Sequence, residues 1–147
     1  MNKLLGIAVL AGALGGLAEI GWLALYTAFA PISAAEVGRE VAATVLSSAA
    51  AAPWAPWAGV GIHLALSVFL GLAFVGGLWW LSGGRPGTRL VWTTAVPALV
   101  AVWAINFFLV LPALGSELST LMPLGATLLS KALFGVAMAA VVQEAAA

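Results

Sequence analysis

The 147-residue chain carries five basic and five acidic residues, only 7% in total, whereas hydrophobic residues make up 64% and the mean hydropathy is +1.16. A soluble domain of this size needs a polar surface with about 25% charged residues, so the composition excludes one. The net charge of zero, without a basic tract, excludes nucleic acid as a partner. The absence of cysteine excludes disulfides, thiolate metal sites and cysteine nucleophiles. A polytopic membrane protein remains.

Four apolar segments are each long enough to cross the hydrocarbon core of a bilayer, which takes about 20 helical residues. They cover residues 4–30, 57–81, 90–111 and 123–143. The alternation of period two that marks a membrane barrel is missing, so helices are favoured over strands. The sequence therefore predicts an all-α integral membrane protein, a four-transmembrane-helix bundle that residues 1–147 form as a single membrane domain.

The basic residues indicate how this bundle is oriented. Lys3, Arg85 and Arg89 fall on one side of a four-span chain, whereas the other side carries Arg39 among acidic residues. By the positive-inside rule we expect both termini in the cytoplasm, an N-in/C-in topology in the bacterial cytoplasmic (inner) membrane. The alternative is that the first segment is a cleaved signal peptide. Its apolar run exceeds the usual 7–15 residues and Glu19 interrupts it, which favours a membrane span.

The segment between the first two spans predicts a short amphipathic helix at about residues 34–48, on the outer face of the membrane. Ser33 and Glu36 have the spacing of a capping box at its start. Val37, Val41 and Val45 recur every four residues on one face. Two interpretations stay open. The helix is either a connection that packs over the bundle, which we favour, or a lid or docking surface.

Each predicted span contains one strongly polar side chain: Glu19, His63, Asn106 and Lys131. At 1.5 Å per residue, all four lie roughly 9–17 Å from the outer end of their helix. Polar groups in spanning helices are costly and usually face the interior of the bundle. We therefore expect the four to form one buried polar cluster.

Small and polar residues surround these positions and indicate where the helices approach one another. Those expected to form the wall of the cluster or to support it are Ser67, Trp103, Thr127 and Ser130. Trp103 lies too deep for the aromatic belt at the interface, so it either borders the cluster or is a packing aromatic, the interpretation that we prefer.

Two interpretations of the cluster remain open. In the first, Glu19 and Lys131 form a buried ion pair that fixes the register of the helices, with His63 and Asn106 supplying hydrogen bonds. In the second, the cluster is a working site for protons, an ion or a substrate, as ionisable groups inside a membrane suggest.

Neither a cofactor nor catalysis is expected. His63 is a weak candidate ligand for haem or a metal, because a single histidine excludes bis-histidine haem and a nearby lysine opposes a metal. Ser67 follows His63 by one helical turn, but a third catalytic group is missing from the pattern. We therefore predict no catalytic residues and no enzymatic activity.

Scattered residues in all four spans resemble the small bacterial inner-membrane proteins of the YagU type. The residues that carry the resemblance are the stretch 12–19 that ends in Glu19, His63 with Ser67, Asn106 with Pro112, and Pro123 with the stretch 130–135. The resemblance implies a four-helix membrane fold and no assigned activity. It also implies histidines near the positions of Asn106 and Lys131, and their replacement here argues against a shared metal site.

With so little sequence outside the predicted spans, a site for a soluble substrate has little room. The function that we expect is therefore that of an accessory or assembly subunit, whose partners are the lipid bilayer and a larger membrane protein complex. The alternative is a small transporter or an ion- or proton-conducting protein that uses the polar cluster. Since four helices are few for transport, that alternative requires a homo-oligomer.

Overall fold

The computed structural model describes residues 2–146, and helices are the only regular secondary structure within that range. Four helical stretches are long and apolar enough to cross a membrane. They are α1 (Asn2–Thr27), α3 (Ala55–Leu81), α4 (Thr88–Ile105) with its continuation to Ala113, and α7 (Leu124–Ala146). The predicted all-helical class and the four apolar helices are confirmed. The side of the membrane on which each end lies stays a prediction.

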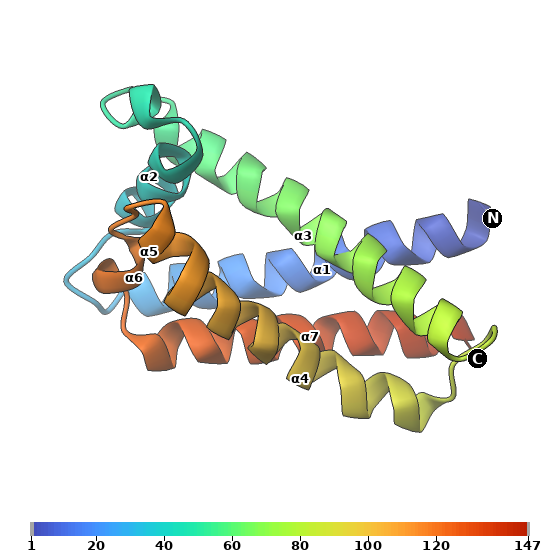
Figure 1. Ribbon diagram of the computed structural model, residues 1–147. Coiled ribbons are helices and arrows are strands. Elements are labelled where there is room, and N and C mark those ends of the chain that lie inside the picture. Colours follow the sequence, from blue (N-terminus) through green and yellow to red (C-terminus); the bar gives the residue numbers. More distant parts are fainter. Residues whose placement is uncertain (1, 147) are drawn as a thin grey trace.

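The shorter elements gather at one end of the molecule. They are α2 (Ala34–Val45), the 3-10 turn η1 (Ser47–Ala49), α5 (Leu111–Ala113) and α6 (Leu118–Leu121). Both termini and the turn that joins α3 to α4 lie at the opposite end (Figure 1). The structure therefore has a bare end and an end covered by short helices, which we call the capped end.

The long helices pack in the order α3, α1, α7, α4, each mainly against its neighbours in that series. The largest apolar core lies toward the bare end, where Val75, Val91, Phe134 and Met138 are fully buried. Toward the capped end, a cavity separates α3 from the end of α4. The bundle is thus closed at the bare end and open between α3 and α4 near the capped end.

Glycine makes the close packing between the long helices possible. A Cβ atom at Gly12 would overlap the backbone of α3 at Ser67, and one at Gly71 would overlap the backbone of α1. Gly15 similarly accommodates the ring of Phe134 on α7. Small residues allow helix backbones to approach closely, and van der Waals contacts of this kind drive association where lipid removes the hydrophobic driving force.

The sequence predicts one continuous helix for the third span, but the structure interrupts it. Residues Asn106–Val110 form a π-helical turn, η2, in which the amide of Leu111 donates to the carbonyl of Asn106. Pro112 follows directly, and proline both lacks an N–H donor and clashes with the carbonyl four residues earlier. A wider turn ahead of it relieves that conflict. Such turns are frequent at functional sites.

The helix predicted to begin at residue 34 does so, with Ser33 as its N-cap and the reciprocal capping box formed with Glu36. It ends at Val45, earlier than the predicted residue 48, and the chain continues into η1. Val37, Gly38 and Ala42 are buried, and α2 packs against α3. Its other side is held by Glu40, which accepts hydrogen bonds from the Ser116 hydroxyl and the Glu117 amide. A position at the outer membrane surface stays a prediction.

We expect acid to weaken the start of α2. Glu36 accepts hydrogen bonds from the amide and the hydroxyl of Ser33, both at 2.7 Å. These bonds, the backbone one foremost, hold the pKa of Glu36 below its usual 4.5. A carboxyl with a lowered pKa stabilises the fold above its unfolded pKa and loses that contribution as the pH falls through the folded value. The loss therefore begins near pH 4.5 and is complete only below the folded pKa.

An NMR titration of the Glu36 carboxyl in micelles checks this expectation. Ser33→Ala removes the hydroxyl donor and keeps the amide, so it should return the pKa only part of the way toward 4.5. An unshifted pKa in the unmodified chain would contradict the capping account.

Candidate functional site

Three of the four polar side chains expected in the cluster meet between α1, α3 and α7. The Nζ atom of Lys131 lies 2.6 Å from Oε2 of Glu19, and Nε2 of His63 lies 3.4 Å from the same oxygen. Glu19 is only 4% exposed. The structure therefore places the two charges that lie deep in apolar helices in direct contact. Since they have opposite signs, neither charge is left unpaired in a low-dielectric environment.

Glycines position this contact. Gly15 lies against Phe134, which follows Lys131 by three residues on α7, and Gly16 lies against Ser67, which follows His63 by four on α3. Both neighbouring helices thus come close to α1 one turn before Glu19. The stem of Lys131 then reaches across to the carboxylate, with Nζ 5.5 Å from the centre of the Phe134 ring.

A chain of hydrogen bonds extends from Glu19 along α7 to α4. The hydroxyl of Ser130 lies 3.1 Å from Oε1 of Glu19 and 2.7 Å from the carbonyl of Thr127, and its single proton serves one of them at a time. The hydroxyl of Thr127 accepts a 3.0 Å hydrogen bond from Nε1 of Trp103. Ser130 therefore contacts the ion pair directly, and Thr127 and Trp103 follow behind it.

Trp103 combines the two roles that the sequence leaves open. It is buried, stacks on Phe107 with ring centres 5.7 Å apart and meets Phe108 edge-on at 5.6 Å. It is thus a packing aromatic, and its indole N–H also closes the hydrogen-bond chain on the α4 side.

Asn106 and Ser67 do not bond to the ion pair. Within residues 2–146 the side-chain amide of Asn106 makes no hydrogen bond, so the expected support for Glu19 and Lys131 from that residue is not formed. Ser67 is buried and donates to the carbonyl of His63 on its own helix at 2.7 Å. The depth of Asn106 in its helix is comparable with that of the other three, and its side chain lines the larger cavity described below, together with His63 and Lys131.

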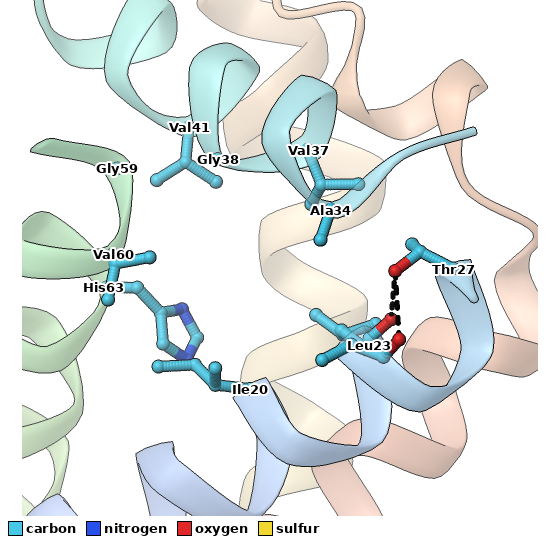
Figure 2. A pocket seen from close by; sticks show the side chains of 11 residues that line it. Ile20, Leu23, Thr27, Ala34, Val37, Gly38, Val41, Gly59, Val60 and His63 are labelled. Atoms are coloured by element: carbon cyan, nitrogen blue, oxygen red, sulfur yellow. Dashed lines mark hydrogen bonds between the residues drawn. The ribbon is translucent and has the colours of Figure 1, made fainter. Parts of the chain in front are cut away.

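Two cavities flank the cluster, and His63 lines both. The smaller, of about 100 Å³, lies beneath α2 between α1 and α3. Figure 2 shows the His63 ring at its edge beside Ile20, with Val37 and Val41 of α2 above. The larger, of about 380 Å³, lies between α3 and the end of α4, and Asn106 and Lys131 also line it.

Sequence reasoning misses two contacts close to the cluster. The indole of Trp22 donates a 2.9 Å hydrogen bond to the carbonyl of Ala126 and so ties α1 to α7. Trp22 follows Glu19 by three residues, and this spacing on one helix face is a signal that could have indicated the contact. The second is the crossing of α2 and α3 at Gly38 and Gly59, where a Cβ atom at Gly59 would overlap the Gly38 carbonyl. Neither glycine has a sequence signal that identifies its partner.

The chemistry of the site opposes a metal. No group of three or more His, Cys, Asp or Glu side chains with the geometry to hold a metal ion occurs among residues 2–146. Glu19, the carboxylate nearest to His63, is already paired with the ammonium of Lys131. A metal at His63 would therefore have to compete with a cation for its second ligand.

Comparison of the chain with protein-family models, curated proteins and solved structures finds no match. The resemblance to proteins of the YagU type stays a prediction.

Proposed function

We propose that this chain is a non-enzymatic accessory or assembly subunit that packs against a larger complex in the bacterial cytoplasmic membrane, with both termini in the cytoplasm. Lys3 is at the start of α1, Arg85 is in the turn between α3 and α4, and Arg89 is in the first turn of α4. The start of α1 and that turn lie at the bare end (Figure 1). An excess of basic residues favours the cytoplasmic side. The capped end would then face outward.

One observation carries the proposal of a partner. The outer face of α3 bears a stripe of exposed small residues that no other part of the described chain covers: Gly61 and Ala65 on one side of the exposed Phe69, and Ala73 and Gly76 on the other. A Cβ atom at Gly61 or Gly76 would meet nothing within 4 Å. Gly12 and Gly71 bring helices of this chain together, whereas Gly61 and Gly76 face away from the rest of the described chain. In lipid, small residues on a helix face favour close contact with another helix, so the stripe is suited to a transmembrane helix of a partner.

Extraction from the native membrane in mild detergent, followed by a native gel, tests this proposal. We expect co-migration with a larger heteromeric complex. The double variant Gly61→Leu/Ala65→Leu should lower the fraction of the chain that co-migrates with this complex at least tenfold, because the added side chains hold the partner helix away. The matched control Ala101→Leu, on an exposed position of α4, should stay in the complex. A discrete homo-oligomer or a free monomer in the unmodified sample would refute the proposal.

A second candidate function is that of a small oligomeric transporter or proton-conducting protein. It is favoured by the place of His63, which lines both cavities and has Nε2 3.4 Å from Glu19. A titratable ring between two spaces is suited to passing a proton between them.

Flux into proteoliposomes measures this activity. His63→Gln, which keeps the Glu19–Lys131 pair, should abolish a proton flux that Glu117→Gln, an exposed change at the capped end, leaves intact. Equal flux in protein-free vesicles would remove this candidate.

A further inference from the structure

The larger cavity is an open groove near the capped end, between α3 and the end of α4. Its walls are apolar and come from both helices: Ile62, Leu66, Phe69, Val102, Ile105 and Val110. Several of these side chains are largely exposed along its rim, Phe69 at 65% and Ile105 at 54% among them. Since α3 and α4 are membrane-spanning candidates, the mouth of the groove would face lipid.

The floor of this groove has more hydrogen-bonding capacity than the chain uses. The amide of Asn106 is half-buried and has no partner within residues 2–146. The Nε2 atom of His63 is not part of this floor, because it is buried 3.4 Å from the carboxylate of Glu19. The Nζ atom of Lys131 carries three donors, and in the described chain its one hydrogen bond is to Glu19. Hydrocarbon cannot satisfy such groups, and leaving them unpaired costs free energy. The floor is therefore suited to an occupant that brings a polar head.

The charge of the floor indicates the charge of that head. Lys131 is neutralised by Glu19 at 2.6 Å, so the pair adds no net charge to the groove. An anionic head would approach the buried carboxylate without a free cation to balance it, and a cationic head would compete with Lys131. Either ion would also lose its hydration. A neutral head with both acceptor and donor capacity meets Asn106 and Lys131 without that cost.

We propose that the groove between α3 and α4 binds a neutral lipid with a single aliphatic tail and a hydroxyl or carbonyl head. The head hydrogen-bonds to Asn106 and to Lys131, and the tail lies between Leu66 and Ile105. The volume of about 380 Å³ is within the range of about 300–1,000 Å³ found for sites of small molecules, which are mostly apolar with a few polar groups. This inference does not rest on the accessory-subunit proposal, because the walls and the polar floor of the groove are formed by this chain alone.

Photolabelling of the purified chain in lipid nanodiscs tests this inference. The probe is hexadecanol with a diazirine on its tail, and labelled peptides are mapped by mass spectrometry. We expect labels on residues 62–70 and 102–110, and we expect an excess of unlabelled hexadecanol to remove them. Hexadecane and hexadecyl sulfate should compete at least tenfold less well, because one lacks the polar head and the other carries a charge.

Two variants and one control locate the binding. Asn106→Leu should weaken labelling about five- to tenfold, the effect of one hydrogen bond, without unfolding the chain, since the amide has no partner to lose. Ile105→Trp should abolish labelling by filling the groove. Val136→Trp makes a similar change on an exposed position of α7 outside the groove and should have no effect. If Ile105→Trp loses its helical circular dichroism, Leu66→Trp takes its place as the variant that fills the groove, and we expect it to abolish labelling as well.

Four results would overturn the inference. Equal competition by hexadecane would reduce the labelling to ordinary contact with bilayer lipid. Equal competition by hexadecyl sulfate would refute selectivity for a neutral head. Labelling at an unmodified level in Ile105→Trp, or a groove closed by a second copy of the chain in cross-linked dimers, would exclude the groove as the binding site.

Discussion

Glu19→Gln alone should destabilise the chain more than Glu19→Gln combined with Lys131→Met. The single change leaves the ammonium of Lys131 buried without its partner at 2.6 Å, whereas the double change removes both charges. Breaking a buried pair from one side typically costs about 3–5 kcal/mol, and replacing both partners by uncharged groups of similar volume is often close to neutral. We therefore expect the effects of the two single changes to be strongly non-additive, with an interaction energy of at least about 3 kcal/mol between the two positions.

The free energy of unfolding in mixed micelles, measured for the unmodified chain, both single variants and the double variant, checks this expectation. Leu129→Met, on an exposed position of α7, controls for the effect that any substitution by methionine in that helix has on the free energy of unfolding. Additive effects of the two single changes would exclude an energetically coupled pair. A strong coupling, with the double variant as stable as the unmodified chain, would assign the pair to helix register and folding.

Gly59→Ala should detach α2 from α3. The added Cβ would overlap the carbonyl oxygen of Gly38, and backbone atoms lie on both sides of the contact, so no side chain can move aside. Forcing extra atoms into a packed contact costs about 1–3 kcal/mol, and here the whole of α2 has to shift. We expect faster hydrogen exchange at the amides of α2, with the long helices unchanged.

Gly61→Ala is the matched control, two residues further along α3. Its Cβ meets nothing within 4 Å, and alanine is favoured over glycine in a helix by about 1 kcal/mol. This variant should therefore be as stable as the unmodified chain or slightly more so. Equal protection of α2 in Gly59→Ala and Gly61→Ala would refute the close crossing of α2 and α3.

The sequence predicts the spans and the contact between Glu19 and Lys131 because both can be read from single helices, without knowing how the helices pack. Length and hydropathy identify a span, and the distance from its end gives the depth of a polar residue. Two opposite charges at similar depth in apolar helices have a strong reason to pair, whatever the details of packing.

The sequence does not predict that Asn106 makes no hydrogen bond with the ion pair. Depth is one coordinate, and the contact also depends on which helices are neighbours and how each is rotated. The structure separates α3 from α4 near the capped end, and the π-helical turn at Asn106 alters the rotation of the residues that follow. Neither the packing order nor the turn can be derived from the periodicity of one segment. The same holds for Gly38 and Gly59, whose closeness depends on how two helices cross.

Photo-cross-linking in the native membrane tests the proposed function most directly. A photoreactive amino acid in place of Ala65 tests the small-residue stripe of α3. The same photoreactive amino acid in place of Ala101 tests an exposed position of α4. The proposal predicts a cross-link from Ala65, and a much weaker one from Ala101, to a membrane protein other than this chain. Cross-links from Ala65 only to lipid or to a second copy of the chain would contradict it.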